Sequence, residues 1–297
     1  MKKLLVIFIL LTGILSAQSV PKDTSYTPHS AAKKMYKKFP EAKLVSPMLP
    51  EGIKAEENIV YKKIGDRDLH LNIYYPETAG AKTYPGVLMI HGGGWISGDE
   101  SLVIPMAQRL AARGYVTVTV EYRLTPEALY PAGVYDLKAA VRWMKANGNK
   151  YHIDTGRIAS YGCSAGGELA SFLGTTGNLK MFNKGEFPNI SSAVQAVVNV
   201  DGLLDFTNIN STKYDDNPEK PSAAHKWFGA SYKDKPGIWK EASPITYVSK
   251  NCPPIIFINS GQPHYHAGSS CCFVMNSYLA RSSSYSSSVP RFTGPIS

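Results

Sequence analysis

Residues Tyr161–Gly167 read Y-G-C-S-A-G-G, which places one serine among glycines directly after an apolar run and before a helical pattern. Within this stretch, Gly162–Gly166 has the form G-x-S-x-G, the sharp strand-to-helix turn that raises a serine hydroxyl above a sheet. The glycines are needed because side chains two residues either side of the serine would collide with the turn. The pattern predicts Ser164 as a nucleophile, with the amide of Ala165 positioned to bind a developing oxyanion.

A second glycine motif precedes the serine turn in the chain. Residues His91–Trp95 read H-G-G-G-W and follow a continuous apolar strand pattern at Gly86–Ile90. Three glycines let main-chain amides approach a substrate carbonyl, as in the second oxyanion loop of an α/β-hydrolase. The order of the two motifs therefore favours hydrolytic chemistry at Ser164 over a chance match.

The pattern of apolar residues predicts an α/β fold with a mostly parallel central sheet and helices on both faces. A hairpin around Gly65 and Asp66 adds an antiparallel edge, and the polar residues 206–242 suggest an excursion over the sheet. Hairpin strands are expected at Val60–Ile64 and Leu69–Tyr74, further strands at Gly86–Ile90, Tyr115–Val120, Arg157–Tyr161, Ala193–Val200 and Ile255–Asn259, and helices at Val103–Ala112, Asp136–Ala146, Ala165–Leu173 and Ala223–Phe228.

The first 17 residues have the character of a signal peptide. Two lysines precede an apolar run at Leu4–Leu15, and small residues up to Ala17 offer a cleavage site. The run is too short to span a bilayer comfortably, and no later window approaches the roughly 20 apolar residues that a membrane span needs. We expect cleavage after Ala17, export to the periplasm or medium, an arm or lid at 18–57, and a hydrolase domain at 58–268.

The formal net charge is +9. Part of this charge is a lysine cluster before the first strand, which indicates either a solvated arm or contact with an anionic polymer or membrane surface. The solvated arm is the expectation, and no nucleic-acid-binding pattern accompanies the cluster. The cluster comprises Lys33, Lys34, Lys37, Lys38 and Lys43.

The four cysteines show no repeated spacing, so neither a disulfide framework nor a structural metal is expected. They are Cys163, Cys252, Cys271 and Cys272.

The chain from about Val60 to Ser260 resembles α/β-hydrolases of the hormone-sensitive-lipase-like and bacterial carbohydrate-esterase group, which includes feruloyl and acetylxylan esterases. Beside the two glycine motifs, the resemblance rests on several shorter matches. These are Glu121-Tyr122-Arg123-Leu124, Pro131-Ala132-Gly133, the run from Asp136 to Trp143, Ile153-Asp154 with Arg157-Ile158, and the run from Trp239 to Pro244.

The resemblance implies roles for the residues of the two glycine motifs. Ser164 would be the acyl-accepting nucleophile, with oxyanion-hole amides from Gly93, Gly94 and Ala165. His91 resembles a histidine that shapes the loop, with Gly92, Gly162 and Gly166 as further motif positions, and Cys163 is expected to pack beneath the turn. Trp95, Tyr122 and Arg123 are candidates for the border of the pocket, although a core role is equally compatible with their positions.

The rest of the catalytic triad is harder to place. Such a serine needs a histidine base oriented by a carboxylate, in the chain order serine, acid, histidine. Glu241 is the last carboxylate in the chain, and residues 269–297 are serine-rich without Asp, Glu or His. One hypothesis is a shift of reading frame near Gly268. If the tail is genuine, Asp201 or Asp205 is the candidate acid, although turn roles suit both, and His266 is the best base, followed by His264 and His225.

The resemblance thus implies an exported serine esterase that needs no cofactor and cleaves acetyl or feruloyl esters of plant cell-wall polysaccharide such as xylan. Two alternatives stay open: a general carboxylesterase or lipase, and a hydrolase-like protein that lacks a complete triad. The expected partner is an acylated polysaccharide or oligosaccharide, and the oligomeric state is not indicated.

Overall fold

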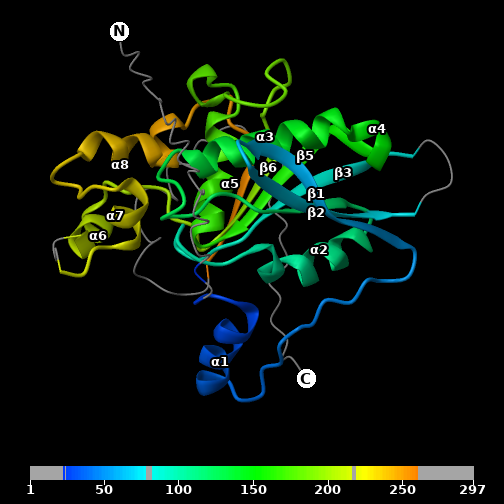
Figure 1. Cartoon of the computed structure of the whole chain (residues 1–297), viewed down its shortest axis with the longest axis horizontal. Helices are drawn as coiled ribbons and strands as arrows, with labels where there is room; N and C mark the ends of the chain where they lie inside the picture. Colours follow the sequence, from blue (N-terminus) through cyan, green and yellow to red (C-terminus); the bar gives the residue numbers. More distant parts are fainter. Residues whose placement is uncertain (1–22, 24, 78–81, 216–218, 260–297) are drawn as a thin grey trace, which may run out of the picture.

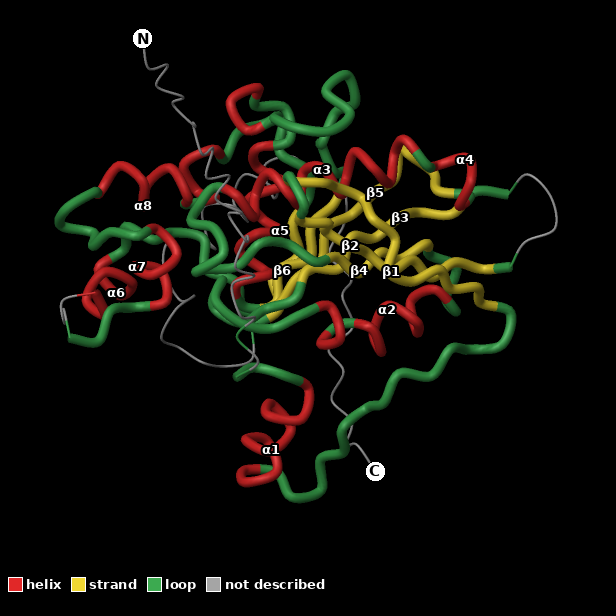
Figure 2. Tube along the Cα trace, viewed as in Figure 1, coloured by secondary structure: helices red, strands yellow, loops and turns green. Residues whose placement is uncertain are grey.

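A computed structural model describes residues 23, 25–77, 82–215 and 219–259. In this part of the chain seven strands form one sheet in the order β1-β2-β4-β3-β5-β6-β7 (Figures 1 and 2). The pairs β1–β2 and β2–β4 are antiparallel and the other pairs are parallel. The strands are β1 Ile53–Ile64, β2 Arg67–Pro76, β3 Tyr84–Ile90, β4 Val116–Val120, β5 Ile153–Cys163, β6 Ala196–Val200 and β7 Ile255–Ile258.

The helices lie on both faces of the sheet, as the sequence predicts (Figure 1). They are α1 Pro28–Lys38, α2 Ile104–Ala111, α3 Ala132–Ala146, α4 Gly148–Tyr151, α5 Ala165–Thr176, α6 Ile209–Thr212, α7 Ala223–Phe228 and α8 Pro236–Ala242. None of the helices in the described residues is long and apolar enough to cross a bilayer.

The core is divided by the sheet into two layers. In β3, Leu88 and Ile90 pack into the larger cluster, which also contains side chains from α3 and α5. Val87 and Met89 point to the other face and pack with Ala107 of α2. Because both faces of β3 are covered, its sequence is continuously apolar rather than alternating.

The predicted hairpin is present, but its first strand is longer than the sequence indicated. β1 starts at Ile53, within the segment assigned to an arm, and pairs with β2 down to the turn at Gly65, whose φ is +57°. The pairing shifts register between Glu56 and Ile59 and again between Val60 and Lys62. Such irregularities break the two-residue alternation from which a strand is recognised in a sequence.

The segment 206–242 forms a cap at one end of the sheet. It contributes α6, α7 and α8, which lie together at the left of Figure 1, on the opposite side of the molecule from α4. The helix expected at Ala223–Phe228 has those bounds, with Ser222 as its N-cap and Gly229 in the left-handed conformation after its end. This cap provides part of the cavity described below.

Some expectations fall on residues outside the described ranges. These are the signal peptide, the tail at 269–297, the histidines at 264 and 266, and the cysteines at 271 and 272. Cys163 and Cys252 are free thiols. Among the described residues no group of three or more His, Cys, Asp or Glu side chains could hold a metal ion.

Candidate active site

Ser164 lies in the connection between β5 and α5, in a backbone conformation that few residues adopt. Its φ is 56° and its ψ is −122°, and the side chain is exposed. The turn is fixed from both sides: the amide of Ser164 donates to the carbonyl of Val200 at 2.8 Å, and its own carbonyl accepts from Glu168 at 3.1 Å. A non-glycine residue held at positive φ is strained, and such strain is typical of functional sites.

Two glycines make this turn possible. A Cβ on Gly162 would overlap the carbonyl oxygen of Gly166, and a Cβ on Gly166 would overlap the carbonyl oxygens of Ile90 and His91. The serine turn and the end of β3 therefore touch through backbone atoms alone. The spacing of the G-x-S-x-G motif follows directly from this contact.

The glycine loop after β3 lies against the serine turn. A Cβ on Gly92 would come within 2.6 Å of the carbonyl oxygen of Cys163. Gly93 and Gly94 have φ values of +127° and +63°, and the carbonyl of Gly93 accepts from the amide of Ser97 at 3.1 Å. These positive φ values need glycine and allow the loop to turn back over Ser164.

Of the three expected oxyanion donors, Gly94 and Ala165 line the same cavity as Ser164, whereas Gly93 is not among its lining residues. The amides of Gly94 and Ala165 donate no hydrogen bond to any described residue. Ala165 is also the first residue of α5, where backbone amides have no partner within the helix. Both amides are therefore available to a ligand.

His91 is buried in the loop, away from the cavity lining. Its Nδ1 donates to the carbonyl oxygen of Gly92 at 2.8 Å. Its ring stacks on Tyr122 with centroids 4.5 Å apart, and the Tyr122 hydroxyl donates to the His91 carbonyl at 2.9 Å. These contacts give His91 and Tyr122 a loop-shaping position.

A buried carboxyl joins the glycine loop to the nucleophile helix, and sequence analysis did not single it out. The indole Nε1 of Trp95 donates to Oε2 of Glu168 at 2.9 Å. Glu168 is fully buried, and its Oε1 has no hydrogen-bond partner among the described residues. Burial raises the pKa of Glu168 well above its ordinary value of 4.5, which favours the protonated carboxyl. A single acid in the otherwise apolar start of α5 was the available signal.

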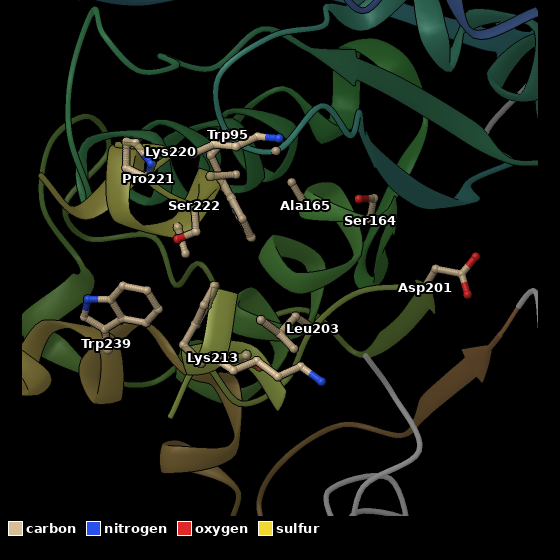
Figure 3. Close-up of a pocket in the computed structure, with 15 residues that line it drawn as sticks. Trp95, Ser164, Ala165, Asp201, Leu203, Lys213, Lys220, Pro221, Ser222 and Trp239 are labelled. Carbon is tan, nitrogen blue, oxygen red and sulfur yellow. The ribbon is translucent and has the colours of Figure 1, made fainter. Parts of the chain in front are cut away.

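A cavity of about 650 Å³ opens beside Ser164 (Figure 3). One part of its lining is aromatic or aliphatic, and another part carries hydroxyls and lysines from the cap. The apolar part includes Trp95, Leu203, Phe206 and Trp239, and the polar part includes Ser211, Lys213, Lys220 and Ser222. A cavity of this size with a few polar groups is typical of small-ligand sites.

The two candidate acids occupy different positions. Asp201 directly follows β6 at a φ of 52° and lines the cavity, and Figure 3 shows it on the same side of the cavity as Ser164. Asp205 does not line it. Its Oδ1 accepts from the amide of Thr207 at 2.8 Å and from the Thr207 hydroxyl at 2.7 Å. Asp205 thus stabilises a turn, so the structure favours Asp201 of the two.

His225, the third candidate base, does not face the cavity either. Its Nδ1 lies 2.9 Å from Oδ1 of Asp215, and its own amide donates to the Ser222 hydroxyl at 3.0 Å. Asp215 also accepts from the amide of Tyr232 at 2.8 Å. No histidine in the described ranges lines the cavity. The two preferred candidates, His264 and His266, lie outside those ranges.

Of the three residues expected at the border of the pocket, one lines the cavity and two do not. Trp95 lines the cavity, whereas Tyr122 and Arg123 do not. Arg123 is instead held by Asp136, with its Nε 2.8 Å from Oδ2. Cys163 is half-buried beneath the turn, and burial followed by the nearby Asp201 raises the pKa of its thiol. A raised pKa disfavours the thiolate, so Cys163 is a poor nucleophile.

We next compared the chain with protein-family models, curated proteins and solved structures. The family model BD-FAE matches residues 71–264, about two thirds of the chain. The chain belongs to the BD-FAE family. With a mostly parallel seven-stranded sheet and helices on both faces, this BD-FAE protein has the α/β-hydrolase fold, as the sequence analysis expected.

Several solved structures are similar to this BD-FAE protein. One is described as "Truncated form of carbohydrate esterase from gut microbiota", with a TM-score of 0.64 and 22% identity, and it covers 80% of this chain and 87% of that one. Another is "Bifunctional GH43-CE Bacteroides eggerthii", with a TM-score of 0.63 and 26% identity over 76% of this chain and 31% of that one.

Curated relatives include two proteins of Mycobacterium tuberculosis (strain ATCC 25618 / H37Rv). Esterase LipQ is 30% identical over 66% of this chain and 46% of its own length. Esterase LipC is 29% identical over 65% of this chain and 47% of its own length. The BD-FAE protein therefore spans about half the length of the curated relatives it matches.

Proposed function

We propose that this BD-FAE protein is a serine esterase that hydrolyses carboxylic esters through an acyl-enzyme at Ser164. The observation that carries the proposal is the exposed, strained serine at the start of α5, beside two amides that donate to no described residue and an open cavity. Relatives that carry the name esterase support the same chemistry.

In the proposed first step the Ser164 hydroxyl oxygen attacks the ester carbonyl carbon, and the carbonyl oxygen becomes an oxyanion. The amides of Gly94 and Ala165 bind this oxyanion, which costs no reorganisation because the backbone already holds them in place. The tetrahedral intermediate then collapses, the alcohol leaves with the proton taken from Ser164, and an acyl ester remains on the serine.

Proton transfer requires a base that the described residues do not place in the cavity. We assign this role to His266, with His264 as the second choice, and assign Asp201 to orient the imidazole. In the second half of the reaction the same base takes a proton from water, the hydroxide attacks the acyl group, and Ser164 is regenerated. The cycle consumes one water for each ester cleaved.

We further propose that the substrate is an acetyl or feruloyl ester on plant cell-wall polysaccharide such as xylan. A similar solved structure is described as a carbohydrate esterase, and the aromatic lining of the cavity suits a sugar ring or an aromatic acyl group. Export through the apolar N-terminal segment, with cleavage after Ala17, would bring the protein to a polymer that cannot enter the cell.

A general carboxylesterase is the second candidate. It is favoured by the mixed apolar and hydroxyl lining of the cavity, which makes few fixed polar contacts, and by the esterase relatives. This candidate shares the Ser164 chemistry and differs only in the ester that is hydrolysed.

Hydrolysis of p-nitrophenyl acetate by the wild type and by Ser164→Ala tests the chemistry. We expect kcat/KM to fall by about a thousandfold or more, because the nucleophile is removed and only the oxyanion hole and binding remain. Ser211→Ala is the matched control, since it removes another hydroxyl from the same cavity. Equal rates for the wild type and Ser164→Ala, or no activity in either, would contradict an esterase at this serine.

A substrate panel tests the second part of the proposal. We expect acetylated xylan or methyl ferulate to have a higher kcat/KM than p-nitrophenyl esters of increasing acyl length. A preference for long-chain p-nitrophenyl esters, with no release of acetate or ferulate from xylan, would establish the carboxylesterase candidate instead.

A further inference from the structure

Helix α1 stands apart from the rest of the molecule. It comprises Pro28–Lys38, contains no buried residue, and projects from the body on the side away from α3 (Figure 1). Its start is well defined: Thr27 accepts from the Ser30 amide at 3.2 Å, and the Ser30 hydroxyl accepts from the Thr27 amide at 2.8 Å. The helix is therefore locally specified by a capping box, and its one side-chain hydrogen bond with the following described segment is at the Tyr36 hydroxyl, which accepts from the Leu44 amide at 3.0 Å.

One face of α1 is apolar. Met35 follows Ala31 by four residues, so these two side chains lie on one face, and Phe39 is the C-cap residue directly after the helix. Tyr36 continues this face beside them. The large side chains of the face are exposed: Met35 by 50%, Tyr36 by 40% and Phe39 by 42%.

The opposite face of α1 is cationic. Lys33 and Lys37 form one pair at a spacing of four residues, and Lys34 and Lys38 form a second. None of the four makes an ion pair with a described residue, and the helix itself contains no acidic residue. Four uncompensated positive charges therefore stand beside the exposed apolar face.

We propose that α1 is a peripheral anchor for a bilayer surface rich in anionic phospholipid. In this arrangement the apolar face of Met35 and Phe39 enters the boundary between head groups and acyl chains, while the lysines contact lipid phosphates. The exposed apolar side chains favour a bilayer over an anionic polysaccharide, and Lys38, whose Nζ lies 5.4 Å from the centroid of the Phe39 ring, places a positive charge at the edge of the apolar face. A polysaccharide would bind the lysines but would leave Met35 and Phe39 in water.

The root of the helix lies beside the candidate active site. Tyr26, which immediately precedes the N-cap, is half-buried, and burial followed by the neighbouring Cys163 thiol raises the pKa of its hydroxyl. Cys163 precedes Ser164 in the serine turn. The segment that leads into α1 therefore comes close to the serine turn.

Co-sedimentation of the full chain with lipid vesicles tests the anchor. We expect binding to vesicles of phosphatidylglycerol and phosphatidylcholine in equal parts, and at least about tenfold weaker binding to phosphatidylcholine alone. Lys37→Gln with Lys38→Gln should weaken binding to the anionic vesicles by about thirtyfold, at roughly 1 kcal/mol for each lysine near the surface. Met35→Ser with Phe39→Ser should weaken it by at least about tenfold, because the inserted apolar area is lost.

The control carries the same kinds of substitution at another exposed site, Lys180→Gln with Met181→Ser, and should bind as the wild type does. Circular dichroism checks that every variant is folded. Absence of binding to anionic vesicles would overturn the proposal. So would binding to polygalacturonate that is insensitive to the Met35 and Phe39 substitutions, which would instead establish a polysaccharide contact. The readout is independent of ester hydrolysis, so it can fail while the esterase proposal stands.

Discussion

The contact between Trp95 and Glu168 connects the glycine loop to the helix that follows Ser164. The backbone of Trp95 has a φ of 61° at the end of the glycine loop. Among the described residues, the indole Nε1 donates only to the buried carboxyl. One face of the Trp95 ring stacks on Trp227, with 4.8 Å between the ring centroids. A buried carboxyl in α5 therefore holds Trp95, the residue directly after Gly94.

The protonation state of Glu168 gives a prediction about stability and pH. Burial raises the folded-state pKa above 4.5, whereas the unfolded chain ionises near its ordinary value. Between these two pKa values the folded state keeps a proton that the unfolded state loses, so the stability of the wild type falls as the pH rises. Glu168→Gln has no ionisable group at this position, so this fall in stability should be absent. Its amide oxygen can still accept the hydrogen bond from the Trp95 indole.

We therefore expect Glu168→Gln to gain free energy of unfolding relative to the wild type as the pH rises above 4.5. Urea unfolding at several pH values from acidic to mildly alkaline measures the difference. The same substitution at the exposed Glu41 is the matched control. A difference between Glu168→Gln and the wild type that does not change with pH would show that the carboxyl is ionised in the folded protein.

The sequence predicted the serine turn but did not single out Glu168. Backbone crowding at Gly162 and Gly166 is a local constraint, so it appears in the sequence as a motif of fixed spacing. The partner of Glu168 is Trp95, which is more than seventy residues away in the chain. Such a pair follows from the packing of β3 and α5 and not from local spacing.

At the scale of elements, a buried ion network ties α3 to the sheet. Asp136 of α3 is fully buried, with Oδ1 2.9 Å from Nζ of Lys62 in β1 and Oδ2 2.8 Å from Nε of Arg123 after β4. Two cations share one carboxylate that has no access to water. The network fixes the N-terminal half of α3 against the hairpin side of the sheet.

Asp136→Asn should lower the free energy of unfolding by about 3 kcal/mol, because it removes the charge of the buried carboxylate that Lys62 and the partly buried Arg123 share. The control is Asp154→Asn, which breaks an exposed ion pair with Arg157 and should cost at most about 1 kcal/mol. Chemical denaturation of the two variants under the same conditions makes the comparison. Similar losses for both would contradict a structural role for the buried network.

Three elements, α7, β1 and α1, show which helices and strands can be recognised from the sequence. The helix expected around Ala223–Phe228 is present as α7, and an N-cap serine and a following glycine mark its ends. The start of β1 was missed, because bulges interrupt its alternation. Helix α1 was not predicted, because the prolines around it and the weak periodicity of residues 18–57 suggested an arm.

At the scale of the whole molecule, three distant segments meet at one cavity. The glycine loop provides Gly94 and Trp95, the serine turn provides Ser164 and Ala165, and the cap from α6 to α8 provides most of the remaining lining. The first two segments were expected to meet because the ends of adjacent parallel strands lie together. The contribution of the cap was only a general expectation, since a polar excursion gives no periodic pattern that would position its side chains.

The central claim is that Ser164 is a reactive nucleophile in this cavity. The most direct measurement is the mass of the wild type after reaction with a small p-nitrophenyl alkylphosphonate, from which p-nitrophenolate leaves as the serine–phosphorus bond forms. The modified peptide is then located by mass spectrometry. The account predicts one adduct per chain on Ser164, and none in Ser164→Ala treated in the same way. An adduct on another residue, or an unmodified Ser164 in folded wild type, would contradict it.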